Sequence, residues 1–334
     1  MAGAGLRAAL ALLLAAALAT PAAARPAEPE AFEFVPPPWR VAGERGRMRV
    51  VQRQCRIEPT RQVRRRIVDL AVQEWAALGF QTIDARPVER RRLPDGVVAD
   101  AANPVRPTPR NVRHVLRVGT WETDPDADAT IAGYWSATPD GPAVLARQNR
   151  QWRGGSDGPV DWVQPWSAAF VSWVMCEAGL GAPEQFARDI SHRVYIDQAI
   201  RARDGAAPGA AYEAWDAGEQ PLEPGDLLCN SRGGVDYRRL ADRRPDLGDY
   251  APAHCDIVVR VADDRINVIG GNVMQGVSLT ILPLTREGTA HPRPVAEADI
   301  AGARTIFAHL KLRADPVGPD AMDRSPVLRE GLRP

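Results

Sequence analysis

Apolar residues recur every three or four positions between residues 60 and 80, and Gly79 stands where such a run is expected to stop. This spacing predicts an amphipathic helix. The same reasoning predicts a helix of apolar and small residues over 166–181, closed by Gly179 and Gly181, and a short helix over 191–203. The apolar positions of the first helix are Val63, Ile67, Leu70, Ala71, Trp75 and Leu78.

Extended segments dominate the last third of the chain. A turn leading into a strand is expected at 221–232, two strands around a DDR turn at 253–272, and further strands at 276–284 and 305–312. A shorter strand-like run lies at HVLRVGTWE, from residue 114. Helices followed by consecutive antiparallel strands predict an α+β domain, with N-terminal helices packed on a small antiparallel sheet.

Other segments lack periodicity. Residues 1–24 have one arginine, an alanine- and leucine-rich run and small residues before a cleavage point, which is typical of a signal peptide. Residues 25–55 are rich in Pro and Ala and predict an extended linker. Residues 56–130 are expected to form a helix and an irregular extension, with a solvated acidic turn at 124–130. The main domain is expected at 131–315, and a mobile tail at 316–334.

Charge and composition narrow the function classes. The 334-residue chain has 42 Lys and Arg and 42 Asp and Glu residues, so no long-range field favours nucleic acid or anionic lipid. No second apolar stretch approaches membrane length, so a soluble periplasmic or secreted bacterial protein is expected after signal cleavage. The oligomeric state is left open by the sequence.

The four cysteines are Cys55, Cys176, Cys229 and Cys255. In an exported chain they allow two disulfides in three connectivities, and their spacing does not suggest a zinc site. A pairing of Cys229 with Cys255 is predicted from their places on adjacent strands.

Three polar residues fit a single catalytic site. Ser167 starts a predicted helix, where the helix dipole stabilises an anion. His254 opens a predicted strand and can act as base, and Asn272 ends the neighbouring strand and can orient His254. Asp256, two residues after His254 on the same strand face, is the alternative third residue.

The segments that carry these residues resemble a known family. PWSAAFVSW (165–173), PGDLL (224–228), HCDIVV (254–259) and VIGGN (268–272) follow the order and spacing of CHAP-type amidase/peptidase domains, papain-like domains that cut peptidoglycan peptides. The chain also resembles a bacterial family of exported domains of unknown function that has serine at this position. The resemblance implies a papain-like α+β fold over roughly residues 130–315, without a metal or an organic cofactor.

The departure from the CHAP pattern is Ser167, which stands where that family has cysteine. A hydroxyl loses its proton only during attack, so serine needs a strongly oriented base, usually one paired with a carboxylate. Asp256 can supply that charge, although side chains two apart on a strand rarely meet in good geometry. Cys255 cannot replace the thiol, because adjacent strand residues point to opposite faces.

Other readings of these residues stay open at this stage. Ser167 can be a nucleophile, a binding hydroxyl in an inactive site, or a helix N-cap, and Asn272 can serve a turn after two glycines. His192 can cap the helix over 191–203, and with Tyr195 and Trp166 it can line a substrate groove. The sequence favours an exported hydrolase of cell-wall peptide or amide bonds, the alternative being an inactive domain that binds peptidoglycan or a protein partner.

Overall fold

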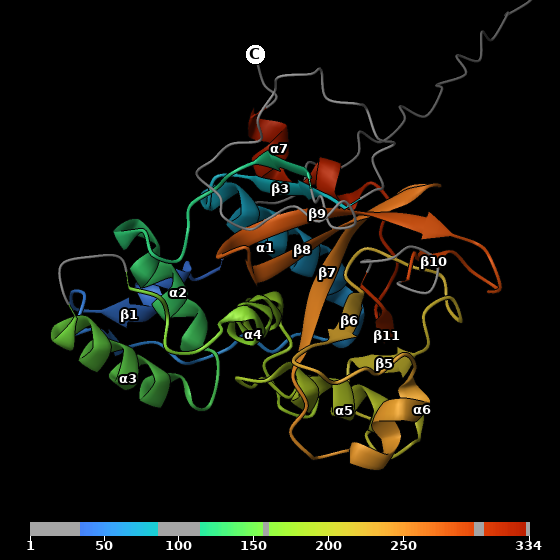
Figure 1. The fold of residues 1–334 in the computed structure, drawn as a ribbon, viewed down its shortest axis with the longest axis horizontal. Coiled ribbons are helices and arrows are strands. Elements are labelled where there is room, and N and C mark those ends of the chain that lie inside the picture. Colours follow the sequence, from blue (N-terminus) through green and yellow to red (C-terminus); the bar gives the residue numbers. More distant parts are fainter. Residues whose placement is uncertain (1–33, 86–113, 156–159, 297–303, 332–334) are drawn as a thin grey trace, which may run out of the picture. The chain divides into compact units, whose positions relative to one another are not determined.

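The computed structural model describes residues 34–85, 114–155, 160–296 and 304–331, so the predicted signal peptide lies outside the described residues. Within these ranges the chain is a mixed α/β structure with seven α-helices (Figure 1). They are α1 (Arg64–Ala77), α2 (Asp128–Trp135), α3 (Gly141–Gly154), α4 (Ser167–Ala178), α5 (His192–Arg203), α6 (Leu240–Arg243) and α7 (Pro326–Gly331).

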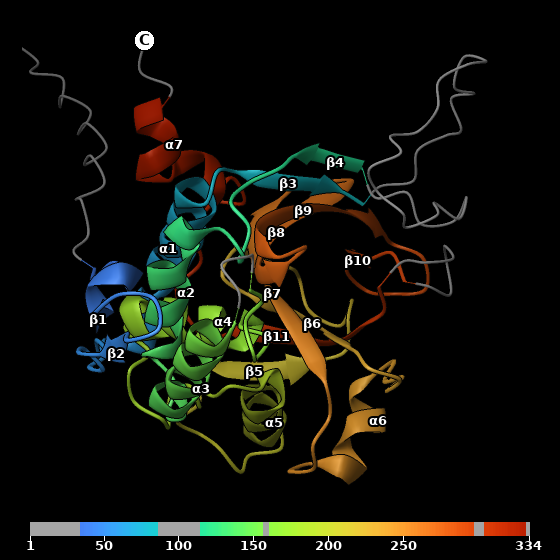
Figure 2. The ribbon, with the colours of Figure 1, turned by 60° about the vertical axis from the view of Figure 1, so that its left-hand side comes forward.

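A nine-stranded sheet forms the centre of the fold, in the order β4-β3-β9-β8-β7-β6-β11-β5, with β10 paired to β9. These strands are β3 (Gln81–Asp84), β4 (His114–Arg117), β5 (Tyr212–Trp215), β6 (Leu227–Ser231), β7 (Ala253–Val261), β8 (Arg265–Val273), β9 (Gly276–Thr285), β10 (Arg293–Pro294) and β11 (Ile306–Leu312). Figures 1 and 2 show β3 and β4 at one end of the sheet and β5 with α5 at the other.

The sheet is larger than the sequence predicted, and it is mixed. β3 runs parallel to β9, whereas the other pairings are antiparallel. β4 falls in the strand-like run predicted at HVLRVGTWE, whereas β3 was not predicted. β3 has only four residues, and an alternation of apolar and polar positions over so short a run is not enough to predict a strand.

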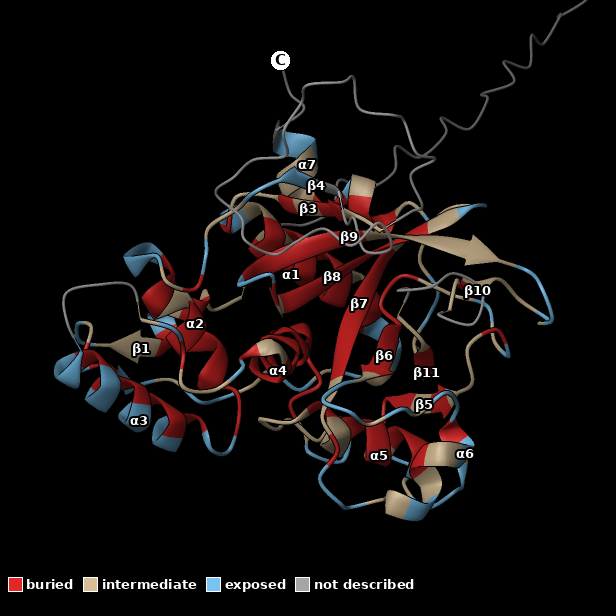
Figure 3. Ribbon diagram, viewed as in Figure 1, coloured by how far each residue is buried: buried red, intermediate tan, exposed pale blue. Residues whose placement is uncertain are grey.

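Helix α4 is the buried centre of the helical layer. It packs on α1 and α2 and against β7 and β8, and every residue from Ala168 to Ala178 is buried (Figure 3). A helix that is apolar all round is expected to be enclosed on all sides. Gly179 ends it in the left-handed conformation, with φ 115°.

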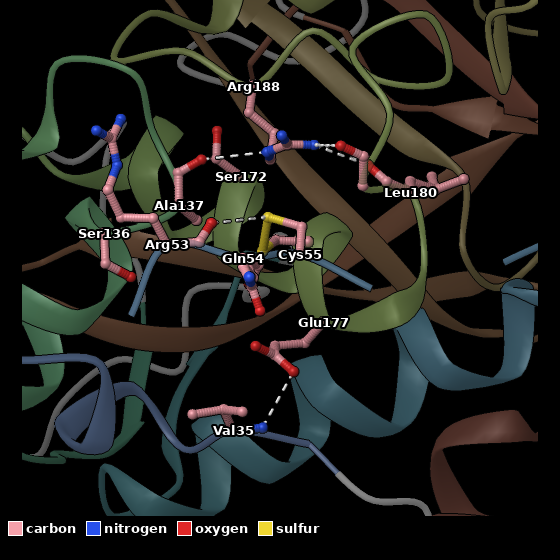
Figure 4. Close-up of a disulfide and its surroundings, with 12 residues drawn as sticks. Val35, Arg53, Gln54, Cys55, Ser136, Ala137, Ser172, Glu177, Leu180 and Arg188 are labelled. Carbon is pink, nitrogen blue, oxygen red and sulfur yellow. Dashed lines mark hydrogen bonds between the residues drawn. A yellow bond between two sulfur atoms is a disulfide. The ribbon is translucent and has the colours of Figure 1, made fainter. Parts of the chain in front are cut away.

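The segment preceding α1 is not the extended linker that its composition suggested. It forms a 3-10 turn (Pro37–Arg40) and two short paired strands, β1 (Val41–Ala42) and β2 (Arg49–Val50). The fully buried Arg40 pairs with Glu177 on α4, and Glu177 also accepts a hydrogen bond from the Val35 N–H at 3.0 Å (Figure 4). Arg40 also donates to the Gln54 carbonyl at 2.9 Å, so this segment is held by specific polar contacts rather than by a periodic apolar face.

A disulfide between Cys55 and Cys176 ties the same segment to the C-terminal part of α4 (Figure 4). Cys229 and Cys255 form the second disulfide, which confirms that predicted pairing. The two cysteines lie directly opposite each other on β6 and β7. All four cysteines of the chain are therefore oxidised.

Two further segments differ from expectation. The acidic stretch at 124–130 begins as a largely exposed 3-10 turn (Pro125–Ala127) but continues into α2, where Asp128 is buried and bonded to Arg45 at 3.2 Å. Beyond residue 316, a 3-10 turn (Ala321–Arg324) and α7 pack against α1, with Ala321 and Met322 buried, so this part is not a free tail. Among the described residues, no helix is both long and apolar enough to cross a membrane.

Candidate functional site

Ser167 is the first residue of α4 and is partly exposed. The N-cap position belongs to Trp166, and no side-chain capping bond is made there, so Ser167 is not a plain helix cap. Its Oγ instead lies 2.6 Å from Nε2 of His192. The N–H groups of the first helical turn have no intrahelical acceptors, and the helix dipole adds partial positive charge beside Oγ.

His192 is the first residue of α5, and its ring is almost fully buried. The segment before it is held against α4, because Ser172 Oγ donates to the Asp189 carbonyl and accepts from the Asp189 N–H, both at 3.2 Å. A carboxylate oxygen of Asp189 accepts from the Ser191 N–H at 2.9 Å. These bonds bring the first residues of two helices together, which places His192 against Ser167.

Both ring nitrogens of His192 are engaged. Nε2 faces Ser167, and Nδ1 contacts the hydroxyl of Tyr195 one helical turn further along α5. When Nδ1 carries the ring proton, the Tyr195 oxygen accepts it and Nε2 can accept from the Ser167 hydroxyl. In the other tautomer Tyr195 donates and Nε2–H points at Ser167. Only the first tautomer lets His192 act as a base toward Ser167.

The surroundings of His192 keep its ring neutral. Burial lowers its pKa well below the usual value, and the nearby His254 and Arg232 act in the same direction. Asp256 opposes them by favouring the charged form. A neutral imidazole is the form that can accept a proton at neutral pH.

A second pair lies beside the first. His254 Nε2 is 2.7 Å from Oδ1 of Asp256, and both side chains are buried. Although side chains two apart on a strand rarely meet well, these two form a good hydrogen bond. Burial would raise the pKa of Asp256, but His254 and the Arg304 and Arg232 guanidinium groups hold it well below its usual range.

The two glycines before Asn272 make room for this arrangement. A Cβ at Gly270 would come 1.9 Å from Oδ1 of Asp256, and a Cβ at Gly271 would come 2.5 Å from the Cβ of Phe170 on α4. Gly270 therefore admits the carboxylate, and Gly271 admits the helix. The two glycines of the VIGGN motif thus serve close packing around the site, while Asn272, with φ 54°, adopts the left-handed conformation that its turn reading predicted.

The structure does not bring Ser167 and His254 into the hydrogen bond that the sequence predicted. Among the described residues, the Ser167 side chain bonds to His192 and the His254 side chain bonds to Asp256. The two imidazole rings lie 5.2 Å apart, centroid to centroid. His192 thus occupies the place beside Ser167 because α5 starts there, a contact between elements that no local pattern reveals.

Asn272 lies in a different set of contacts. Its amide donates to Oε2 of Glu122 at 2.5 Å, and the indole N–H of Trp166 donates to the same oxygen at 2.7 Å. Asn272 has φ 54° and makes no bond to His254. Glu122 is buried and joins the start of α4 to the β8–β9 turn. No motif pointed to Glu122, which is the last residue of the strand-like run HVLRVGTWE.

The residues predicted to bind substrate are deeply placed. Trp166 is fully buried and stacks on Tyr134, so its side chain is part of the core. Tyr195 is also buried and stacks on Phe186, with its hydroxyl on His192. His192 belongs to the site itself rather than to a groove wall. Within the described ranges, no group of three or more His, Cys, Asp or Glu residues is arranged to hold a metal ion.

Comparison with known sequences assigns the region of the site to one family. A family model described as an uncharacterised protein conserved in bacteria (DUF2272) matches residues 116–310. This range is more than half of the chain and includes Ser167, His192, His254, Asp256 and Asn272. No curated protein and no solved structure matched the chain.

Proposed function

This chain belongs to the DUF2272 family of uncharacterised bacterial proteins, and we propose that it is an exported hydrolase of peptide or amide bonds in the cell wall. Ser167 is its nucleophile. The observation that carries the proposal is the 2.6 Å contact between Ser167 Oγ and His192 Nε2 at the start of α4. A nucleophile within hydrogen-bond reach of a neutral base, on a helix N-terminus, is the arrangement that acyl transfer requires.

The reaction follows from these positions. As Ser167 Oγ bonds to the carbonyl carbon, its proton passes to His192 Nε2, and the carbonyl oxygen becomes an oxyanion beside the first N–H groups of α4. His192 then gives the proton to the leaving amine, and an acyl ester on Ser167 remains. Water, deprotonated by His192, hydrolyses this ester and restores the serine.

The second pair supports this chemistry electrostatically. While the proton is on His192, the ring is an imidazolium, and the negative charge of Asp256 favours that form. His254 stands between the carboxylate and the His192 ring and is held by its bond to Asp256. In this proposal His254 and Asp256 are therefore positioning residues, and His192 is the base.

Three features support the compartment and the substrate class. Residues 1–24 have a signal-peptide pattern, and two disulfides are compatible with an oxidising compartment. The CHAP-type resemblance of the four motifs favours peptidoglycan peptides. A papain-like assignment is supported by a nucleophile-bearing helix packed against the strands that carry His254 and Gly270. These features make cell-wall peptide the first substrate to test.

The test compares purified mature protein with its Ser167→Ala variant on peptidoglycan sacculi, with released fragments identified by mass spectrometry. Release by the wild type and not by the variant is the expected result, and the fragments name the bond that is cut. Equal release by both proteins would remove Ser167 from the reaction.

A second candidate is a catalytically silent binding domain. The observation that favours it is the position of His192 beside Ser167, where the resembled family places the strand histidine, together with the burial of both histidines. Its test is sedimentation with sacculi: binding of wild type and Ser167→Ala to the same extent, with no fragments released by either, supports this candidate.

A further inference from the structure

Two arginines lie side by side at one edge of the site. Asn230 on β6 pairs with His254 on β7 and with Ile306 on β11, so these three positions share a face of the sheet. Arg232 is two residues beyond Asn230, and Arg304 is two residues before Ile306. Because alternate residues point to the same face, both arginines lie on the face of His254 and Asp256.

The backbone extends this pairing beyond the strand ends. The Arg232 N–H donates to the Pro252 carbonyl at 2.9 Å, which continues the β6–β7 ladder by one step. Continuing the antiparallel register of β6 and β11 sets Arg232 opposite Arg304. Two cations opposite each other repel unless an anion lies between them.

Asp256 is the carboxylate whose charge acts on both guanidinium groups. Arg304 Nη1 is 3.4 Å from Oδ2 of Asp256, a carboxylate that already binds His254. Arg232 makes no ion pair and no side-chain hydrogen bond with any described residue, and its side chain reaches solvent. Partial enclosure and the charge of Arg304 lower the Arg232 pKa, as expected for two neighbouring cations with too little counter-charge.

Asn230, which pairs with His254 across β6 and β7, has a side-chain oxygen without a partner. Its side chain is 6% exposed, its amide N–H donates to the Ser231 carbonyl at 3.0 Å, and its Oδ1 atom has no hydrogen-bond partner in the part of the chain that is described. A buried acceptor without a donor costs roughly 1–3 kcal/mol, which a ligand N–H would recover.

We propose that Arg232, Arg304 and Asn230 form a subsite that takes a carboxylate of the substrate together with a neighbouring amide N–H. The planar guanidinium forks suit a carboxylate, and Asn230 Oδ1 accepts from the amide. The substrate is then a peptide with a free carboxylate close to the bond that Ser167 attacks. This assignment rests on the proposed function for the position of the scissile bond, but not for binding itself.

The test therefore measures binding without turnover. Calorimetry with the Ser167→Ala protein uses two probes, a soluble stem peptide released from sacculi and the same peptide with every carboxylate converted to the carboxamide. We expect the acid form to bind at least tenfold more tightly than the amide. Adding Arg232→Ala removes that preference, and Arg232→Lys, which keeps the charge but not the fork, restores part of it.

Arg265→Ala is the matched control, because this partly exposed arginine starts β8, beside the end of β7 that is remote from His254, and should leave the preference intact. Equal affinity for the two probes, no binding of the acid form to the folded protein, or a preference that survives Arg232→Ala would each overturn the subsite. If inorganic phosphate bound as tightly as the peptide and displaced it, the arginines would form a site for a free anion and not for a peptide carboxylate. If the wild type released no fragments from sacculi while the Ser167→Ala protein still preferred the acid form, the subsite would stand and the hydrolase proposal would fail.

Discussion

His192, and not His254, is the histidine that contacts Ser167: its Nε2 lies 2.6 Å from the serine Oγ, whereas His254 is bonded to Asp256. The two rings are neighbours, so either could be offered as the base on grounds of proximity alone. Substituting each histidine separately decides which of the two is the base.

We expect His192→Ala to lower the rate of fragment release from sacculi by about 10²–10⁴-fold, as loss of a general base does, and nearly as far as Ser167→Ala. His254→Ala should have a smaller effect, because it removes a neighbour rather than the proton acceptor. His291→Ala, in a loop of the same chain, is the control and should change little. An inactive His254→Ala beside an active His192→Ala would give the base role to His254.

The pH dependence of the reaction follows from the lowered pKa of His192. A base must be neutral, and burial lets this ring stay neutral to a lower pH than an ordinary histidine, whose pKa is 6.5. The rate should therefore hold steady from pH 8 to below 6.5 and fall only in more acidic buffer. Steady-state rates across that range check it, and a fall already centred at or above pH 6.5 would contradict a buried base. Asp256→Asn, which removes the charge that favours the imidazolium, should move the fall to still lower pH.

Three buried carboxyl groups should contribute less to the free energy of unfolding as the pH rises, which is the opposite of what most carboxylates do. Burial raises the pKa of Glu74 to about 7, against which the hydrogen bond from Tyr134 acts, and it raises the pKa values of Asp69 and Asp128 to about 6. A raised pKa means that the folded state holds the proton more tightly than the unfolded state. The contribution of these three carboxyl groups to the free energy of unfolding is therefore largest in acid and is lost as the pH rises from about 4.5 through 7.

For Glu74 the loss is on the order of 3 kcal/mol between those limits, since each pKa unit corresponds to about 1.4 kcal/mol. Urea unfolding at several pH values, followed by tryptophan fluorescence, measures it. Glu74→Gln keeps an acceptor for Tyr134 but cannot ionise, so its stability should depend less on pH than that of the wild type. Parallel curves for the two proteins would show that Glu74 does not titrate in this range.

The limits of prediction from sequence are visible in the same residues. Helical spacing placed α1, α4 and α5, and apolar runs bounded by turn residues placed β6, β7, β8, β9 and β11, whereas the two-residue strand β10 was not predicted. The start of α2 was missed because DATIAGYW has no single apolar face, and β3 because four residues give too little pattern. Cys229 and Cys255 were paired from strand neighbours, whereas the Cys55–Cys176 contact spans 121 residues and has no local signature.

The site shows the same division. Ser167, His254 and Asp256 came from motifs, yet the Ser167–His192 contact depends on how two helix starts meet in space. The spacing of His192 and Tyr195, three apart on one helix, does predict that they touch. What it cannot predict is which side of α5 faces Ser167, since that is set by the Ser172–Asp189 bonds.

The two disulfides should differ in what they contribute to stability. Cys55–Cys176 closes a loop of 121 residues and Cys229–Cys255 one of 26. In the chain-entropy account, removing the first pair costs about 5 kcal/mol and removing the second about 3.5 kcal/mol. Urea unfolding of the two double cysteine-to-alanine variants at one pH tests the order. A larger loss for the Cys229–Cys255 pair would mean that packing between β6 and β7, rather than loop closure, sets the difference.

Asn272 offers a matched pair of variants that separates a catalytic role from a structural one. The residue has φ 54° and donates to Glu122, and it does not touch His254. Asn272→Gly keeps the backbone conformation and loses the hydrogen bond, whereas Asn272→Ala loses the bond and adds about 1 kcal/mol of backbone strain. Both should therefore destabilise the fold, the alanine variant more.

Neither Asn272 variant should lower kcat by more than about threefold, because the Ser167–His192 contact is left in place. Turnover of the sacculus peptide measured beside unfolding in urea gives the two readouts on the same samples. If Asn272 instead orients His254 during the reaction, as the motif order suggested, both variants lose activity to the same large extent whatever their difference in stability. The ratio of activity loss to stability loss thus decides whether Asn272 acts on His254 during the reaction or only stabilises the turn in which it lies.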